Sequence, residues 1–221
     1  MDFAAFGLTL RLASLTTICL LLVATPLAAW IASGHSFARR ILQATIALPL
    51  VLPPTVLGFY LLVGLGPATA LGRTLITLIG HPLAFTFWGL LIGSMIYSLP
   101  FAVQPLIVAF AAVDTPTIEV ASALGASPWT VFRRITLPLS RMSFVTAAVL
   151  TFAHTVGEFG VVLMIGGDIP GVTRTLSISI YDQVQELQYS AANLTAAALV
   201  ALSFAALLVV YGRGRKRPEL V

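Results

Sequence analysis

Residues Ile41–Leu65 read ILQATIALPLVLPPTVLGFYLLVGL, a run in which every side chain is uncharged. A helix rises about 1.5 Å per residue, so about 20 apolar residues cross the ~30 Å hydrocarbon core of a bilayer. Four further apolar runs of similar character lie at about 12–32, 84–110, 142–165 and 193–210. The sequence therefore predicts an all-α integral membrane protein with about five transmembrane helices.

The composition argues against the alternative of a soluble protein with unusually buried helices. Hydrophobic residues make up 58% of the chain and charged residues only 9%, against about 25% charged residues in a soluble domain. Five apolar runs leave almost no polar face for water. The connections 66–83 and 166–192 are too short to fold alone, so residues 1–221 are predicted to form one membrane domain.

The distribution of the positive charges predicts the orientation of the chain. With five spans, the loops after spans one and three share one side of the membrane with the C-terminus, and together they carry nine of the twelve Lys and Arg residues. These are Arg39, Arg40, Arg133, Arg134, Arg141, Arg213, Arg215, Lys216 and Arg217. Lys and Arg concentrate on the cytoplasmic side. We therefore expect a cytoplasmic C-terminus, an external N-terminus with an uncleaved first span, and no nucleic-acid partner.

The second span contains Pro49, Pro53 and Pro54 near its middle. Proline removes an amide donor and clashes with the carbonyl four residues earlier, so this helix is predicted to bend or break there. Pro100 and Pro105 repeat the pattern in span three. Freed carbonyls are tolerated in a bilayer only where protein or a wet cavity satisfies them. Span two is thus either part of a transport pathway or a kinked packing helix.

Span four carries two ionisable residues, His154 and Glu158, four positions apart and so on one helical face. A carboxylate inside a membrane is costly and indicates a function. One His and one Glu provide too few ligands for a metal site. A structural pairing near a helix break at Gly157 and Gly160, and a direct role in a pathway, both remain open.

The stretch EVASALGASPWTVFRRITLPLS, Glu119–Ser140, is a patterned polar segment between spans three and four. Thr115 and Pro116 have the residue types of an N-cap and a first helical position, and they place Glu119 in the first turn, where the helix dipole favours an anion. Gly125 is suited to end this helix, because glycine adopts the left-handed conformation readily. A short helix is therefore predicted before Gly125.

A second short helix is predicted to begin at Ser127 and the proline after it, again a cap followed by a proline. Val131, Phe132 and Ile135 fall on one side of this helix, and the two arginines after Phe132 fall on the other. The residues from 115 to 138 are thus expected to form a helix–turn–helix at the cytoplasmic surface.

Six residues of this segment resemble the EAA loop of ABC importer permeases, whose pattern is E-A-A, three residues, G, nine residues, I, one residue, L-P. They are Glu119, Ala121, Gly125, Ile135, Leu137 and Pro138, and Val120 departs from the pattern. The resemblance implies that the loop inserts into a groove on a separate ATPase subunit and moves with it. The alternative is an amphipathic connector that rests on the membrane.

The chain itself has no P-loop, G-x-x-x-x-G-K-[ST], because its single lysine, Lys216, is followed by Arg217. We therefore expect a transporter subunit that is not an enzyme and binds no cofactor, with ATP and Mg²⁺ held by a partner ATPase. The sequences G-x-S-x-G and H-E-x-x-H are absent as well, which disfavours an intramembrane hydrolase.

Two longer stretches, Pro49–Gly66 (PLVLPPTVLGFYLLVGLG) and Gly157–Gln185 (GEFGVVLMIGGDIPGVTRTLSISIYDQVQ), are similar to the permease subunit of molybdate-type ABC importers. This resemblance implies a type I importer fold and a homodimer in the bacterial inner membrane. It also implies two ABC ATPase subunits as partners, and a periplasmic binding protein that delivers molybdate or tungstate. A sulfate or thiosulfate permease would share the architecture, and a proton-coupled transporter that uses His154 and Glu158 is a further alternative.

The transport pathway has six candidate residues: Pro53, Pro54, Thr55, Glu158, Phe159 and Gly160. The apolar runs contain no cluster of Arg or Lys that could hold a dianion tightly, which fits a passage of low affinity. Because a carboxylate would repel an oxyanion, we expect Glu158 to pair with a neighbouring cation or amide.

Overall fold

The computed structural model describes residues 2–212, and within this range every regular element is a helix. The chain order is α1 (Phe3–Ala32), α2 (Phe37–Ala47), η1 (Leu48–Leu50), α3 (Pro54–Leu65), α4 (Ala70–Ile79), α5 (Phe87–Ala111), α6 (Thr115–Ala123), α7 (Pro128–Val131), η2 (Phe132–Thr136), α8 (Leu137–Leu139), α9 (Arg141–Val156), α10 (Gly160–Gly166), α11 (Leu176–Gln185) and α12 (Tyr189–Tyr211). The predicted all-α fold is confirmed. Four of the nine cations used to predict a cytoplasmic C-terminus, Arg213, Arg215, Lys216 and Arg217, lie outside the described residues.

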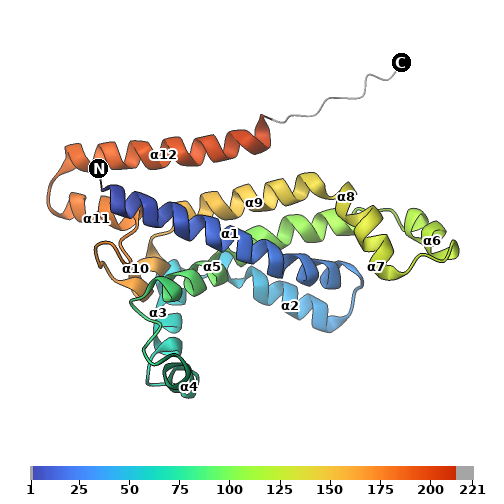
Figure 1. Ribbon diagram of the computed structural model, residues 1–221, viewed down its shortest axis with the longest axis horizontal. Coiled ribbons are helices and arrows are strands. Elements are labelled where there is room, and N and C mark those ends of the chain that lie inside the picture. The colour runs from blue at the N-terminus through green and yellow to red at the C-terminus, as the bar shows by residue number, and fades with distance from the viewer. Residues whose placement is uncertain (1, 213–221) are drawn as a thin grey trace.

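The centre of the fold is a bundle in which α1, α5 and α9 run alongside one another (Figure 1). Leu20, Ala24 and Ala28 face this bundle from successive turns of α1, and they pack with Leu106 of α5 and Ala147 of α9. A spacing of four residues keeps side chains on one face of a helix, and alanines let two helix backbones approach closely. Small residues therefore allow the three helices of the bundle to pack closely.

Three helices are long and apolar enough to cross a membrane: α1, α5 and α12. Two bent pairs raise the number of candidate spans to five, namely Phe37–Leu50 with Pro54–Leu65 at 110°, and Pro128–Leu139 with Arg141–Val156 at 68°. The range expected as span four, 142–165, is divided between α9 and α10.

The first helix begins nine residues before the expected start at Leu12, at Phe3. The Asp2 side chain caps it by accepting a hydrogen bond of 3.0 Å from the amide of Ala5. Arg11 therefore lies inside the helix, with its guanidinium carbon 4.5 Å from the centre of the Phe87 ring. A cation close to a helix end is tolerated because a long side chain can reach polar surroundings and aromatic faces.

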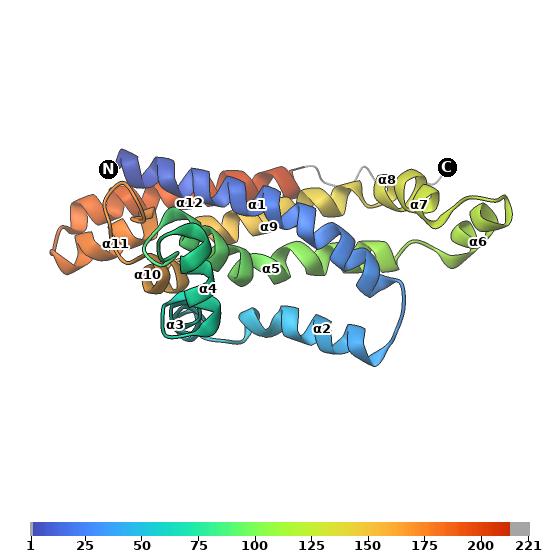
Figure 2. The ribbon, with the colours of Figure 1, turned by 60° about the horizontal axis from the view of Figure 1, so that its bottom comes forward.

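The predicted break in span two is confirmed, since α2 and η1 end before Pro53 and α3 leaves at 110° (Figure 2). Span three behaves differently from the expected repetition of this pattern, because α5 continues as one helix through Pro100 and Pro105. Neighbouring helices can accommodate single lost hydrogen bonds, and α5 packs between α1 and α9. Adjacent prolines that start a new helix are a stronger interruption.

Each of the two connections expected as loops contains a helix of ten residues, α4 in 66–83 and α11 in 166–192. Threonine caps begin both: the side chain of Thr69 accepts from the amide of Gly72 at 3.0 Å, and Thr175 caps α11 in the same way. These cap signals are present in the sequence but lie outside the long apolar runs.

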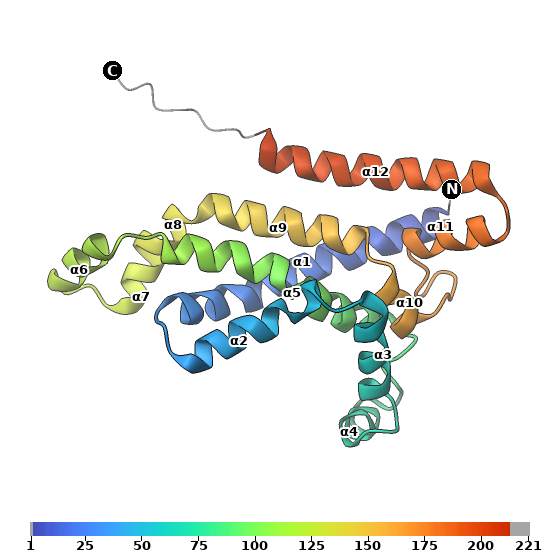
Figure 3. The same cartoon turned by 180° about the vertical axis from the view of Figure 1, so that it is seen from behind.

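The described cations separate toward opposite ends of the bundle (Figures 2 and 3). One end holds the start of α2 and the segment from α6 to the start of α9, which carry Arg39, Arg40, Arg133, Arg134 and Arg141. Toward the other end lie α4, the α10–α11 connection and the N-terminus of α1, with Arg73 and Arg174. This separation is the arrangement expected for connections that lie on opposite sides of a membrane.

Candidate functional site

The first helix of the EAA-like segment starts one residue earlier than expected. Asp114, not Thr115, is its N-cap: the Asp114 carboxylate accepts from the Thr117 amide at 3.1 Å and from the Thr117 hydroxyl at 2.7 Å. These hydrogen bonds hold the pKa of Asp114 below its usual range, the side-chain bond being the larger cause. Aspartate is as good an N-cap as any residue and leaves the helix to begin with Thr115 and Pro116.

Glu119 consequently falls beyond the first turn of α6, which corrects the expected interaction with the helix dipole. Its side chain is exposed. Within the described residues the ion pairs join Arg174 to Asp168 and Asp182, so no cation there anchors Glu119. Its carboxylate faces outward and is free to contact another chain.

Gly125 ends α6 in the conformation predicted for it, with φ +84°. Its amide bonds to the Ser122 carbonyl at 2.9 Å, and the Ala126 amide bonds to the Ala121 carbonyl at 3.0 Å. This pair of bonds is a Schellman motif, which needs a residue with positive φ at this position. An added Cβ at Gly125 would meet nothing within 4 Å, so the requirement for glycine there is conformational rather than steric.

The second helix begins as predicted, with Ser127 as N-cap and Pro128 as its first residue. The Ser127 hydroxyl accepts from the Thr130 amide at 3.2 Å. Val131 is buried, and the side chains of Arg133 and Arg134 are exposed. The predicted division between an apolar and a basic side is therefore confirmed.

This second helix contains a wider π-helical turn, η2, that was not predicted. Pro138, two residues after η2, has no amide hydrogen and cannot bond to the carbonyl of Arg134 in the α-helical manner. The helix continues through Leu137–Leu139 and ends at Ser140, before α9 turns away by 68°. Leu137 is partly buried, and Pro138 is exposed.

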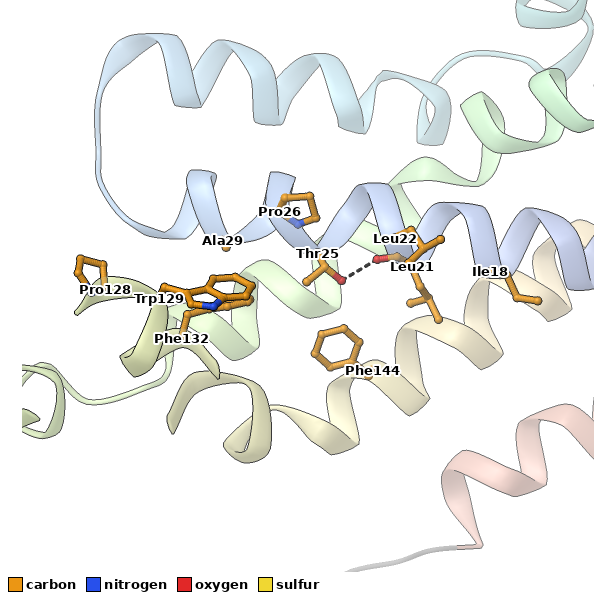
Figure 4. A pocket seen from close by; sticks show the side chains of 10 residues that line it. All are labelled: Ile18, Leu21, Leu22, Thr25, Pro26, Ala29, Pro128, Trp129, Phe132 and Phe144. Atoms are coloured by element: carbon orange, nitrogen blue, oxygen red, sulfur yellow. Dashed lines mark hydrogen bonds between the residues drawn. The ribbon is translucent and has the colours of Figure 1, made fainter. Parts of the chain in front are cut away.

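An apolar groove of about 840 Å³ lies between this helix and the bundle (Figure 4). Trp129 and Phe132 border it from the EAA-like segment, Phe144 from α9, and residues from Ile18 to Ala29 from α1. Phe132 also contacts Phe110 of α5, with ring centres 5.7 Å apart. The segment thus rests on three helices of the bundle through aromatic side chains, a connection that its residue pattern did not predict.

A second cavity, of about 500 Å³, brings the candidate pathway residues together. It is lined by Pro54, Thr55, Tyr97, Ala153, His154, Gly157, Glu158, Phe159 and Gly160. Five of the six candidates therefore share one cavity, and the sixth, Pro53, is the N-cap residue of α3 beside it. The lining comes from α3, α5, α9 and the break before α10. Tyr97 was not predicted.

The helix break that forms part of this cavity lies where the glycines indicated. The helix α9 ends at Val156, Gly157 is its C-cap, and α10 begins at Gly160. An added Cβ at Gly160 would lie 2.8 Å from Cβ of Pro54 and 3.4 Å from the Thr55 nitrogen. Gly160 thus permits α10 to pack against the start of α3.

Glu158 lies beyond the end of α9, so it does not share a helical face with His154 as expected. Its side chain is 3% exposed, and neither carboxyl oxygen has a hydrogen-bond partner among the described residues. The expected pairing with a cation or amide is therefore wrong for this structure. Its backbone carbonyl accepts from the hydroxyl of Ser177 at the start of α11.

His154 belongs to a chain of hydrogen bonds between α9 and α5. Thr155 donates to the Thr151 carbonyl at 2.9 Å, and Ser98 lies 3.0 Å from Thr155 Oγ1 and 2.9 Å from His154 Nδ1. All three bonds form only if Ser98 donates to Thr155 and His154 Nδ1–H donates to Ser98. Stacking on Phe101, with ring centres 4.0 Å apart, holds the imidazole in place, and in the neutral imidazole Nε2 is an acceptor.

A third polar cluster lies between α10 and α11. Arg174 pairs with Asp168, including a bond of 2.7 Å to its Oδ2, and lies 3.2 Å from Asp182. Burial raises the pKa of Asp182 to about 6, with a further contribution from the hydrogen bond and charge of Asp168. The Arg174 guanidinium lowers the pKa of Asp168. Because both carboxylates occupy Arg174, this cation is not available to Glu158.

The family model of binding-protein-dependent transport system inner membrane components matches residues 24–215. The chain is 52% identical over 219 residues to the "Molybdenum transport system permease protein ModB" of Azotobacter vinelandii, covering 99% of this chain and 97% of the relative. Its identity to the ModB protein of Mycobacterium tuberculosis is 36%, over 97% of this chain and 79% of the relative. The "Probable sulfate transport system permease protein cysT" of Zygnema circumcarinatum is 30% identical, over 87% and 67% respectively.

Among solved structures, the chain resembles one in the crystal structure of a bacterial alginate ABC transporter in complex with an alginate pentasaccharide-bound periplasmic protein. The TM-score is 0.77 at 19% identity, over 97% of this chain and 78% of that chain. At this identity the likeness shows the fold, which confirms the predicted type I ABC importer permease architecture. The chain is a multi-pass membrane protein and belongs to the family of binding-protein-dependent transport system inner membrane components.

Proposed function

We propose that this chain is the permease subunit of an ATP-driven importer for molybdate or tungstate. The observation that carries the proposal is the 52% identity, over 99% of the chain, to a permease named for molybdenum transport. The matched length of 219 residues includes the EAA-like segment, the broken helices and the residues that line the cavity. The proposed task of the subunit is to form the passage for the oxyanion and to couple conformational changes of an ATPase to the membrane helices.

The assembly that we propose has two copies of this chain, two separate ABC ATPase subunits and a periplasmic molybdate-binding protein. It lies in the lipid of the bacterial inner membrane, with the N-terminus outside and the C-terminus in the cytoplasm. The five described arginines at one end of the bundle support this orientation, because Lys and Arg concentrate on the cytoplasmic side. ATP and Mg²⁺ belong to the ATPase subunits.

The proposed coupling element is the segment from α6 to α8, with Glu119, Ala121, Gly125, Ile135, Leu137 and Pro138 as its principal residues. It projects from the end of the bundle (Figure 1), and the side chains of Glu119, Arg133 and Arg134 are exposed there. Val131 and Phe132 connect it to α1, α5 and α9. A push on the exposed side would therefore reach the three central helices through apolar contacts.

The proposed passage runs through the cavity that holds Thr55, Glu158 and Gly160. Alternating access requires a two-state element that both ATP and the transported anion bias. The break between α9 and α10 is suited to this role, because the non-helical residues that join the two helices, which begin with Gly157, can absorb a change in backbone angle.

The function is tested with the permease co-purified with its ATPase and reconstituted into liposomes with the binding protein. The expected result is uptake of labelled molybdate that requires ATP inside and the binding protein outside. An equal concentration of sulfate should compete poorly. Uptake without ATP, or uptake abolished by sulfate at equal concentration, would contradict the proposal.

Sulfate import is the second candidate, supported by the 30% identity to the sulfate permease relative. It has less support, because both the identity and the coverage are lower than for the molybdenum permeases of Azotobacter vinelandii and Mycobacterium tuberculosis. The same competition experiment separates the two. A proton-coupled carrier that relies on His154 and Glu158 has less support still, since the two residues lie on different sides of a helix end and His154 bonds to Ser98.

A further inference from the structure

The apolar groove of about 840 Å³ beside the EAA-like segment has no part in the proposed passage. One wall is a stripe on α1 whose residues follow at intervals of three or four: Ile18, Leu22, Pro26 and Ala29. The other wall is aromatic, with Trp129, Phe132 and Phe144 (Figure 4). The hydroxyl of Thr25 also lines the groove, but it donates to the Leu21 carbonyl at 2.6 Å. The lining therefore suits an apolar group, since a polar one would find no partner there.

The groove runs along the bundle toward the basic end. From Ile18 to Ala29, at about 1.5 Å per residue, it extends about 16 Å along α1. The hydrocarbon core of a bilayer is about 30 Å thick, so this length is about that of one leaflet. Because the acyl chains of a bilayer also run along this axis, the groove has the length and the direction of an acyl chain.

Tryptophan side chains mark the level of the membrane surface at this end. Trp129 is 67% exposed, and Trp30, the residue after Ala29, is 46% exposed. Trp88 lies toward the opposite end of the bundle, at the start of α5. Trp is enriched where the hydrocarbon meets the headgroups. The end of the groove at Trp129 is therefore at headgroup level.

Two arginines adjoin this end of the groove. Arg141 is the first residue of α9 and lies three positions before Phe144, so the two share a helical face. Arg133 follows Trp129 by four positions. Both arginine side chains are exposed, the ion pairs within residues 2–212 involve neither, and the carboxylates of α6 and its N-cap do not line the groove. Arg binds phosphate through paired charge-assisted hydrogen bonds, so this rim is complementary to a phosphate group.

The dimensions of the groove favour a lipid over a helix of a second copy. Spread over about 16 Å, a volume of about 840 Å³ gives a mean cross-section of about 50 Å². A helix with its side chains is about 10–12 Å across and needs about 80 Å² or more. Acyl chains are narrower than a helix and bend to follow an irregular wall.

We propose that this groove binds an anionic phospholipid, with an acyl chain along the α1 stripe and the phosphate group at Arg133 and Arg141. An anionic headgroup is favoured over a zwitterionic one because it carries no cation of its own to repel the arginines. On the orientation given under the proposed function, this lipid belongs to the cytoplasmic leaflet. The bound chain lies between the EAA-like segment and the central bundle.

The test measures quenching of Trp129 fluorescence by lipids that are brominated in their acyl chains. The full chain with Trp30→Phe and Trp88→Phe keeps Trp129 as its single tryptophan. It is placed in phosphatidylcholine nanodiscs with increasing amounts of brominated phosphatidylglycerol or brominated phosphatidylcholine. Half of the maximal quenching should need about fivefold less of the anionic lipid.

Substitutions at the rim and in the groove locate the site. Arg133→Gln and Arg141→Gln should each lower the preference for the anionic lipid to about twofold or less. Arg40→Gln, also at the basic end but on α2 and outside the groove lining, is the matched control and should keep the preference. Ala29→Phe narrows the groove and should remove the preference, whereas Ala197→Phe, at an exposed position of α12, should not.

Equal quenching by the two lipids would overturn the inference. An equal loss of preference in Arg40→Gln would also overturn it, because the effect would then belong to the surface potential of the whole end. So would a Trp129 that neither lipid quenches, because protein would then fill the groove. Thermal unfolding checks that each variant is folded, and if Ala29→Phe is not, the arginine variants decide. The measurement needs neither ATPase nor molybdate, so failure of the proposed transport function would leave its result unchanged.

Discussion

The EAA-like segment and the Glu158 cavity differ in how their geometry is fixed. In the segment, the bonds that shape each turn join residues three to five positions apart, such as Asp114 with Thr117 and Ser127 with Thr130. In the cavity, Ser98 contacts His154 at a separation of 56 residues, and Gly160 packs against Pro54. Local hydrogen bonds thus shape the EAA-like segment, whereas long-range packing shapes the cavity.

This difference has a mechanical consequence. A segment stabilised by its own caps can move as a unit without losing its internal structure, because few of its bonds depend on the rest of the protein. The cavity changes whenever α3, α5, α9 and α10 move relative to one another. We therefore expect substitutions in the cavity region to act on folding and passage together, and substitutions in the segment to act on coupling.

The largest effect is expected for Gly160→Val, which disturbs the long-range packing that shapes the cavity. A Cβ there would lie 2.8 Å from Cβ of Pro54, so α3 and α10 must separate. Overpacking of this kind costs about 1–3 kcal/mol of unfolding free energy. Thermal unfolding of the purified protein in detergent measures it. Gly64→Val is the control, because a Cβ at Gly64 meets nothing within 4 Å, and equal losses in both variants would contradict the packing argument.

Gly125→Val tests the local backbone conformation that shapes the EAA-like segment. The positive φ of +84° costs a β-branched residue about 1–2 kcal/mol, although the position is sterically open. The protein should still fold in the membrane, but association with the ATPase subunit and stimulation of ATP hydrolysis should fall. Gly125→Asn should retain most coupling, since asparagine tolerates this conformation. Normal coupling in the valine variant would remove Gly125 from the proposed mechanism.

Ser127→Ala should have a smaller and more local effect. Loss of the cap on the Thr130 amide costs about 1 kcal/mol of helix stability, or roughly a fivefold change in opening. Hydrogen–deuterium exchange should quicken by about this factor in residues 128–139 and remain unchanged in the central bundle. Ser122→Ala is the control, because its hydroxyl bonds to a carbonyl within α6 and caps no helix. Faster exchange throughout the bundle would show that the segment is not stabilised locally.

The smallest effect is expected for Asp182→Asn in the Arg174 cluster. The folded-state pKa of Asp182 is raised to about 6 from 3.8, so the folded protein binds more protons between these values. Its contribution to stability is present at low pH and lost as pH rises through about 6. The cluster is partly exposed, which limits the change to about 1 kcal/mol or less. The midpoint of thermal unfolding between pH 4.5 and 7 should vary less in the asparagine variant, and an unchanged profile would contradict this assignment.

Sequence patterns predicted most of the local features and few of the distant contacts. The glycine at 125, the cap at 127, the break at the prolines in the middle of span two and the break between Gly157 and Gly160 were all expected, because each depends on the conformational preference of a few adjacent residues. The N-cap of α6 was misplaced by one residue, since Asp114 and Thr115 are both good caps. The partners of Glu158 and His154 could not be inferred, because no local pattern says which residues of another helix will face them.

The sequence by itself determined the helical fold class, the approximate spans, the helix breaks of spans two and four and the turn geometry of the EAA-like segment. These follow from apolar run length, from proline and glycine, and from caps, whose effects are confined to about one helical turn. Only the tertiary structure decided that Pro54, Tyr97 and Glu158 line one cavity, and that the Glu158 carboxyl group lacks a partner there. The physical reason is that packing among α3, α5, α9 and α10 depends on the complementary shapes of all four helices together.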